Sequence, residues 1–181
     1  MVVNKEHDEI LMLSVRNGNL EGMSVLFERY HVKLYNFFLR MGMKKAVSQD
    51  LTQNLFYRMI KYRGSYKEGN NVKSWIYQIA RNLHADHCRQ EKINREMLLI
   101  TDTYPAVMSN EEENYIEEDY EKLDKALLSL PDEQRELIIL SRFQGLKYED
   151  ISSITSQSVP AIKVAMHRAI KQLRSIYFQQ V

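Results

Sequence analysis

The sequence predicts an all-α protein of two small helical domains joined by an acidic, extended linker. Only 6 glycines and 3 prolines occur in 181 residues, which is too few for the many tight turns of a strand-rich sandwich or barrel. Apolar residues recur every three or four positions over most of the chain, and this is the period of an amphipathic helix. Charge is divided unevenly along the chain, which indicates separate modules.

The charge distribution sets the expected domain boundaries. Residues 1–95 hold 16 lysines and arginines against 9 aspartates and glutamates, whereas residues 121–181 hold 9 against 7. Residues 96–120 hold 8 acidic residues and no basic one, a composition that favours an extended chain over a packed one. We therefore expect a first domain over 1–95, a linker over 96–120 and a second domain over 121–181. The net charge of +1 gives no signal for a nucleic-acid partner.

Three helices are expected in the first domain. The first begins near Asn19, a good N-cap residue, and ends at Gly42. The second covers about residues 48–62 and the third about 72–91, separated by a loop over 63–71 that is rich in glycine and asparagine. The periodic apolar residues expected in the core are Met23, Leu26, Phe27, Tyr30, Leu34, Phe37, Phe38, Met41, Leu51, Leu55, Phe56, Met59, Trp75, Ile76, Ile79, Ala80 and Leu83.

The second domain shows four helical signals. Leucines at 123, 127 and 130 share one helix face, and Pro131 opens a helix that runs through Phe143 and stops at Gly145. A short helix over about 148–155, a polar turn over 156–158 and a longer basic helix from 159 to about 177 follow. This is the pattern of a helix-turn-helix, whose second helix enters the major groove of DNA.

The sequence shows no pattern of catalytic or cofactor chemistry. No glycine-rich loop for phosphates is present. His84, His87 and Cys88 form a metal-like grouping, but it lacks the paired spacing that marks zinc sites. We expect no enzyme, no cofactor and no metal. The single cysteine and the short aliphatic runs predict a cytoplasmic protein that does not enter a membrane.

Several motifs resemble those of the extracytoplasmic-function group of the sigma-70 family, the small bacterial transcription initiation factors. Residues 50–56 (DLTQNLF) are similar to the family's D-L-x-Q-E-x-F element, and residues 72–82 with Asp86 to its W-L-x-x-I-A-R-N…D element. In the second domain, residues 130–136 are similar to L-P-x-x-x-R, 145–151 to G-x-S-Y-x-E-I and 169–174 to the closing helix. The resemblance covers nearly the whole chain except the linker.

The resemblance implies a first domain of the sigma region 2 type. Such a domain binds the clamp helices of the largest subunit of core RNA polymerase, and then recognises and melts the minus 10 element. It places the polymerase contacts on the polar face that carries Asp50, Gln53, Asn54 and Arg58. An extruded base needs stacking and hydrogen-bonding groups. The residues expected at minus 10 DNA are Arg63, Tyr66, Asn70, Asn71, Lys73, Arg81, Asn82, Arg89 and Lys92.

The resemblance implies a second domain of the sigma region 4 type, near the polymerase flap region, and a linker in the RNA exit path. The residues expected at minus 35 DNA are Ser158, Pro160, Ala161, Lys163, Val164, His167, Arg168 and Lys171. Where relatives carry Thr, Ser and Arg, this helix carries Ala161, Val164 and Ala165, so it has few donors for base edges. In the alternative that we favour, Val164 packs inward and the helix contacts mainly phosphates and methyl groups. In the other alternative, the helix reads the minus 35 element poorly and a separate factor positions the protein at its promoters.

Two other classes of function are open. A stand-alone helix-turn-helix regulator would leave the motifs of the first domain unexplained. A protein-interaction module would bind a partner such as an anti-sigma factor and no DNA. We expect a non-enzymatic sigma factor whose partners are core RNA polymerase, promoter DNA and an anti-sigma factor. A factor delivered to its start sites by a separate DNA-targeting protein is a further alternative.

Overall fold

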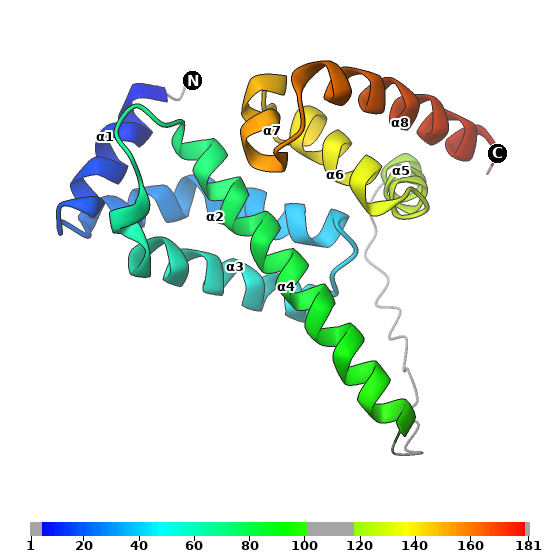
Figure 1. Cartoon of the computed structure of the whole chain (residues 1–181), viewed down its shortest axis with the longest axis horizontal. Coiled ribbons are helices and arrows are strands. Elements are labelled where there is room, and N and C mark those ends of the chain that lie inside the picture. The colour runs from blue at the N-terminus through cyan, green and yellow to red at the C-terminus, as the bar shows by residue number, and fades with distance from the viewer. Residues whose placement is uncertain (1–4, 101–117, 180–181) are drawn as a thin grey trace.

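The computed structural model describes residues 5–100 and 118–179, which form eight α-helices and no strand (Figure 1). This confirms the predicted all-α fold. No helix in these ranges has the length and apolar character needed to cross a membrane. The first module consists of α1 (Lys5–Arg16), α2 (Glu21–Arg40), α3 (Lys45–Lys61) and α4 (Val72–Ile100). The second consists of α5 (Glu118–Leu128), α6 (Asp132–Ile138), α7 (Tyr148–Thr155) and α8 (Val159–Gln179).

The first module is a bundle in which α3 packs against both α2 and α4. Asn19 lies one residue before the N-cap of α2, Leu20, and its Oδ1 accepts the backbone N–H of Glu21 at 3.0 Å. Most of the periodic apolar residues are buried. Phe27 was predicted to lie in the core, but it is 43% exposed. Its ring stacks on that of His31, with ring centres 4.7 Å apart. Tyr77, which the periodicity did not single out, is fully buried.

Helix α1 was not predicted, yet it completes this bundle. Met12 and Val15 are fully buried against the other helices. The Tyr30 hydroxyl donates to Asp8 Oδ2 at 2.6 Å, and burial together with this carboxylate raises the pKa of Tyr30 well above its usual value. Gly22 allows the close approach of α1 and α2, because a Cβ there would lie 3.1 Å from the backbone oxygen of Leu11.

Helix α4 is longer than predicted. It runs to Ile100 instead of about Glu91, so it passes the expected domain boundary at Arg95. Residues 91–97 are exposed and have little apolar periodicity. Ion pairs one turn apart support this part of the helix: Glu91 with Arg95 at 3.7 Å and Lys92 with Glu96 at 4.0 Å. Most of the expected linker, residues 101–117, lies outside the described residues.

The second module follows the predicted helices closely. Helix α6 continues into a π-helical turn, Ile139–Phe143, before Gly145 reverses the chain with a φ of 64°. Helix α7 has the predicted bounds. Ser156, in the turn before α8, adopts a φ of 59° in the left-handed region that favours glycine. Helix α8 packs on α5, α6 and α7, so its other side faces outward.

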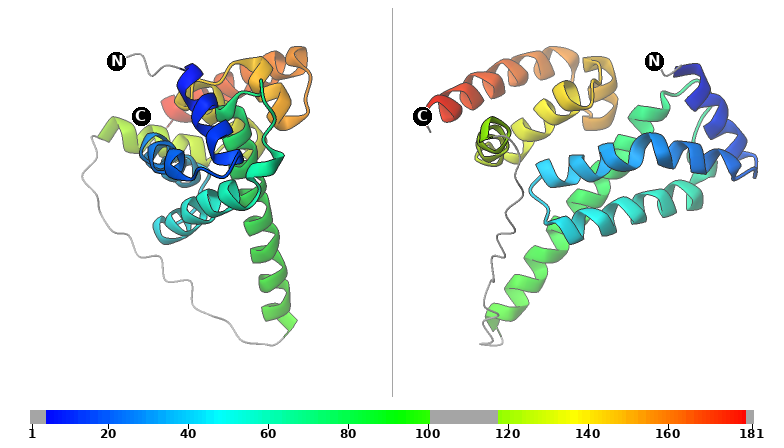
Figure 2. Two further views of the ribbon diagram at one scale, coloured as in Figure 1. Left: turned by 90° about the vertical axis from the view of Figure 1, so that its left-hand side faces the viewer. Right: turned by 180° about the vertical axis from the view of Figure 1, so that it is seen from behind.

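The two modules pack against each other. Helix α7 lies on α4, and α5 contacts α2, as the views in Figure 2 show. The second module therefore covers the N-terminal half of α4, while the C-terminal half of that helix projects away from the rest of the chain (Figure 2). The covered half carries several of the residues that the sequence assigned to minus 10 DNA.

Candidate nucleic-acid and polymerase-binding surfaces

Helix α3 presents the predicted polymerase-binding residues in two different environments. Asp50, Gln53 and Asn54 are exposed on one side of the helix, while its apolar side packs into the core. Arg58 is half-buried, and its Nη1 lies 3.4 Å from Asp86 Oδ2 on α4. Three of the four predicted residues thus form a polar patch open to a partner, and the fourth also links α3 to α4.

Tyr66 lies in the core, contrary to the prediction that it presents its ring to an extruded base. It is 1% exposed, and its hydroxyl donates to the backbone oxygen of Asn70 at 2.6 Å. Its ring meets Trp75 edge-on, with ring centres 5.5 Å apart. Burial raises the pKa of Tyr66 to about 12. The ring closes the loop over residues 63–71 onto the bundle, so neither of its faces is open in this structure.

Trp75 is half-buried, although the sequence placed it in the core. It lines two neighbouring shallow pockets of about 330 Å³ each. The first pocket also contains Tyr62 and Asn82, both exposed. Tyr62 was not predicted as a site residue, and its position directly before the predicted loop is the sequence signal that could have found it. The remaining residues that line this pocket are Arg58, Ser65, Gln78 and Ile79.

Five of the other residues predicted at minus 10 DNA lie on the surface or close to it. Asn70, Asn82, Arg89 and Lys92 are exposed. Arg63 is half-buried, and its Nη1 donates to the backbone oxygen of Ile60 at 3.0 Å. Asn82, Arg89 and Lys92 follow one another along α4, so the part of this helix that the second module does not cover has an exposed polar side.

Three predicted DNA contacts are held instead by the second module. The Nδ2 of Asn71 donates to Asp150 Oδ1 at 3.1 Å. The Lys73 ammonium donates to the backbone oxygen of Gln144. The Arg81 Nε donates to Glu136 Oε1 at 3.0 Å. The structure therefore pairs polar and cationic groups at and near the start of α4 with carboxylates and a carbonyl group, which occupy the place of the phosphate oxygens and base-edge acceptors that nucleic acid would supply.

Glu136 is largely desolvated in this interface, with a side chain that is 12% exposed. Burial raises the pKa of Glu136 above its ordinary value, although the nearby Arg81 guanidinium acts in the opposite direction. The acidic neighbours Glu133 and Asp132 also raise this pKa, so the ion pair does not hold the carboxylate at its ordinary pKa. Such a pair fixes how the modules fit together more than it stabilises them.

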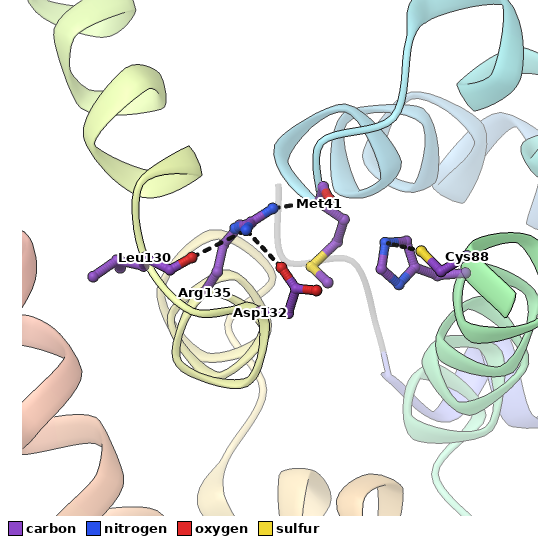
Figure 3. Close-up of polar contacts among 6 residues, drawn as sticks. Met41, Cys88, Leu130, Asp132 and Arg135 are labelled. Carbon is purple, nitrogen blue, oxygen red and sulfur yellow. Dashed lines mark hydrogen bonds and ion pairs between the residues drawn. The ribbon is translucent and has the colours of Figure 1, made fainter. Parts of the chain in front are cut away.

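Arg135, from the L-P-x-x-x-R motif, ties the second module to the first (Figure 3). Its side chain is buried, and Nη1 donates to the backbone oxygen of Met41 at the end of α2, 3.0 Å away. Its Nη2 donates to the Leu130 oxygen at 3.0 Å and to Asp132 at 2.7 Å. The motif arginine is therefore an interface residue in this arrangement.

The His84 and Cys88 pair also lies beside this interface. The Cys88 Sγ is 3.7 Å from His84 Nε2 (Figure 3). Burial lowers the pKa of His84 and raises the pKa of the Cys88 thiol. Within the described residues, no group of three or more histidine, cysteine or acidic side chains is arranged to hold a metal ion.

Helix α8 displays the whole predicted minus 35 set on its outer side. Ser158, at the N-terminus of this helix, has its Oγ 3.4 Å from the backbone N of Ala161, an N-cap contact. Val164 is 54% exposed, so the prediction that it packs inward is wrong. The inward positions are taken by Ile162, Met166 and Ala169. The exposed residues are Ser158, Pro160, Ala161, Lys163, Val164, His167, Arg168 and Lys171.

Comparisons with known proteins agree with this architecture. Residues 26–93 match the family model Sigma-70 region 2, and residues 120–173 match Sigma-70, region 4. The chain is 29% identical over 154 residues to the ECF RNA polymerase sigma factor SigM of Bacillus subtilis, covering 84% of this chain and 93% of the relative. It is 27% identical over 161 residues to the RNA polymerase sigma factor CarQ of Myxococcus xanthus, covering 89% and 92%.

Two solved structures share the fold. CnrH, in complex with the cytosolic domain of CnrY, has a TM-score of 0.74 at 19% identity, with 97% of this chain and 99% of that chain covered. The sigma factor RpoE, in complex with the anti-sigma factor NepR from Bartonella quintana, has a TM-score of 0.68 at 25% identity, with 84% and 94% covered.

A helical protein that carries region 2 and region 4 in this order, with an outward-facing helix-turn-helix, is a promoter-directing transcription factor of the sigma-70 type. The chain belongs to the extracytoplasmic-function group of the sigma-70 family. It is a sigma factor, which directs promoter recognition and transcription initiation.

Proposed function

We propose that the first module binds core RNA polymerase and melts the minus 10 element, while α8 of the second module enters the major groove of the minus 35 element. The observation that carries this division is the outer side of α8. Five cationic or titratable side chains project from it, those of Lys163, His167, Arg168, Lys171 and Arg174, and the sequence of α8 contains no acidic residue. Between the modules, residues 96–120 follow the RNA exit path, where their carboxylates take the place of the RNA phosphates.

Polymerase docking uses the polar patch of α3. Asp50, Gln53 and Asn54 share one side of the helix and are exposed. Polar groups that need no partner within the chain are well suited to a specific hydrogen-bonded interface. The partner surface is the pair of clamp helices in the largest polymerase subunit, and the second module docks near the flap region.

Minus 10 recognition uses the pocket between α3 and α4. Tyr62 and Trp75 supply aromatic surface, and the Asn82 amide supplies both a donor and an acceptor at the same pocket. An extruded base is held by this combination, since stacking on an aromatic ring contributes about 1–3 kcal/mol per base. Arg89 and Lys92, farther along α4, contact phosphates.

In the closed arrangement, the second module packs on the N-terminal half of α4. The two modules must separate before the promoter melts. Asn71, Lys73 and Arg81 cannot bind DNA while Asp150, Gln144 and Glu136 hold them. Each of these hydrogen bonds involves a charged group and has a net stabilising effect of about 1.5–3 kcal/mol. Binding to core polymerase, with the modules docked on the clamp and flap, offsets the loss of these contacts.

The protein works in the cytoplasm, where core polymerase and promoter DNA are present. An anti-sigma factor is a further partner. The RpoE structure that shares this fold contains the anti-sigma factor NepR. By analogy, a partner of this kind would hold the two modules of this chain together and keep the α3 patch from polymerase. Affinity purification of the chain from its own cells, followed by identification of stoichiometric partners, tests this point.

A reconstituted reaction tests the proposed function. The purified chain should co-elute with core polymerase and direct transcription from a supercoiled genomic library, with mapped start sites that share minus 10 and minus 35 elements. Specific duplex binding without polymerase, and no effect on polymerase, would favour a stand-alone regulator. Start sites that share a minus 10 element but no minus 35 element would favour delivery by a separate DNA-bound protein.

A further inference from the structure

The outer side of α8 changes in chemistry along the helix. Pro160, Ala161 and Val164 give its N-terminal part an apolar surface, and Val164 alone is 54% exposed. His167, Arg168 and Lys171 follow on the exposed side. Because positions 161, 164 and 168 are separated by three and four residues, they lie in one row along the helix. The row therefore begins with methyl groups and ends with a guanidinium group.

The position of the apolar part determines what it would meet in a DNA complex. In a helix-turn-helix, the N-terminal residues of the second helix contact base edges in the major groove. Ala161 and Val164 cannot form hydrogen bonds through their side chains, so they cannot distinguish guanine or adenine by bidentate contacts. The major groove has one apolar group that distinguishes bases, the C5 methyl of thymine.

We propose that Ala161 and Val164 recognise thymine methyl groups, so that this sigma factor selects minus 35 elements with thymine at one or two adjacent positions. The inference rests on the proposed function, in which α8 enters the minus 35 major groove. Arg168 and Lys163 hold phosphates on either side of the contact. The helix lacks hydrogen-bond donors for base edges, so its base preference comes from apolar contacts with thymine methyl groups.

Charge favours DNA over a protein as the occupant of this surface. Lys163, His167, Arg168 and Lys171 are exposed around the apolar row. The chain from residue 151 to 181 contains no aspartate or glutamate. A surface with cations around a small apolar centre and no carboxylate is complementary to phosphates that flank a methyl-bearing base.

Replacing thymine by uracil tests the proposal, because it removes the methyl group and keeps every hydrogen-bonding group of the base. Holoenzyme made from this chain and core polymerase is assayed on a mapped promoter, with uracil placed at each minus 35 thymine in turn. Loss of one buried methyl should weaken promoter binding about fourfold at one or two adjacent positions. The same substitutions should have little effect on holoenzyme with Val164→Ala at the position that Val164 contacts.

Lys163→Ala is the matched control on the same helix. It should weaken binding equally on thymine and uracil templates, since a phosphate contact does not depend on the base. The proposal is wrong if uracil has no effect at any minus 35 position in wild-type holoenzyme. It is also wrong if Val164→Ala lowers activity equally on both templates, which would indicate a protein partner on this surface. A failure of the proposed function would be distinct, because the thymine promoter itself would then not be transcribed.

Discussion

The side-chain amide of Asn71 donates a hydrogen bond to the carboxylate of Asp150 across the interface between the modules, with Nδ2 and Oδ1 3.1 Å apart. The Asn71 Oδ1 also accepts the backbone N–H of Lys73 at 3.0 Å and so caps α4. The same Oδ1 accepts the Ser74 N–H at 3.3 Å, so the side chain of a residue assigned to minus 10 DNA has three structural contacts while the modules are packed together. Its amide becomes available to DNA only when Asp150 moves away.

Replacing Asp150 by alanine should loosen the closed arrangement. Its Oδ1 also accepts the Ser74 hydroxyl at 3.0 Å, so the variant loses two hydrogen bonds between the modules. Loss of its capping-box contact to the Lys147 N–H destabilises α7 by a further ~0.3–1.5 kcal/mol. The radius of gyration from small-angle X-ray scattering should increase. Glu149→Ala, which removes an exposed carboxylate from the same turn, should leave the radius unchanged, and an equal increase in both variants would contradict the account.

The two partners of the Arg81 and Glu136 ion pair should respond differently to substitution. Burial raises the pKa of Glu136, so neutral glutamine at this position avoids the desolvation cost. Glu136→Gln should therefore keep or raise the melting temperature at pH 7. Arg81→Gln should lower stability by about 1–2 kcal/mol, because it leaves a buried carboxylate unpaired.

The pH dependence gives the same test a second readout. A carboxyl group whose pKa is raised in the folded state adds stability below its ordinary pKa, about 4.3, and this stability is lost as the pH rises through the raised value. The advantage of Glu136→Gln over the wild type should thus shrink as the pH falls from 7 toward 4.5. A large loss of melting temperature in Glu136→Gln at pH 7 would show that the ion pair outweighs the burial cost.

Substitution of the α3 patch should separate polymerase binding from folding. The triple variant Asp50→Ala, Gln53→Ala and Asn54→Ala should lose affinity for core polymerase in a co-elution or fluorescence assay. Its melting temperature should change little, since exposed substitutions are usually within about 0.5 kcal/mol each. Glu28→Ala, on an exposed position of α2, is the control and should bind normally. Unchanged core affinity in the triple variant would move the docking site elsewhere.

Substitutions of Tyr62 and Tyr66 should affect different properties: the first should reduce promoter melting and the second should reduce stability. Tyr62→Ala removes a ring that is 51% exposed at the Trp75 pocket, so permanganate reactivity of the minus 10 thymines should fall while stability is kept. Tyr66→Phe removes only the hydrogen bond to Asn70. It should cost about 1 kcal/mol of stability and leave promoter melting intact. The reverse pattern would restore the stacking role to Tyr66.

Most of the helical fold follows from local sequence signals. Gly145, Ser158 and the apolar period fix α7 and α8 within one or two residues, because their ends depend on turn and cap chemistry. The end of α4 was missed, since residues 91–97 are exposed and their support comes from ion pairs such as Glu91 with Arg95. Helix α1 was missed because its packing depends on a long-range contact of Asp8 with Tyr30.

The candidate sites could be predicted less completely. The exposed sides of α3 and α8 follow from helical periodicity, and the residues assigned to them are largely exposed. Tyr66 could not be placed, because a tyrosine in a loop has no periodic partner that reveals whether it faces the core. The contact of Arg81 with Glu136 joins residues 55 positions apart. No sequence pattern signals such a pair, so the covered state of α4 appears only in the folded chain.

The most direct test of the account is to lock the two modules together and measure promoter opening. The Ser74 Oγ and Asp150 Oδ1 are 3.0 Å apart, so Ser74→Cys and Asp150→Cys place two thiols within reach of a short, reducible cross-linker. Replacing the single native cysteine, Cys88, by serine keeps the reaction specific. The cross-linked protein should give no permanganate-reactive promoter DNA with core polymerase, and reduction should restore it. Normal promoter opening by the cross-linked protein would contradict the claim that the modules must separate to expose the DNA-binding side of α4.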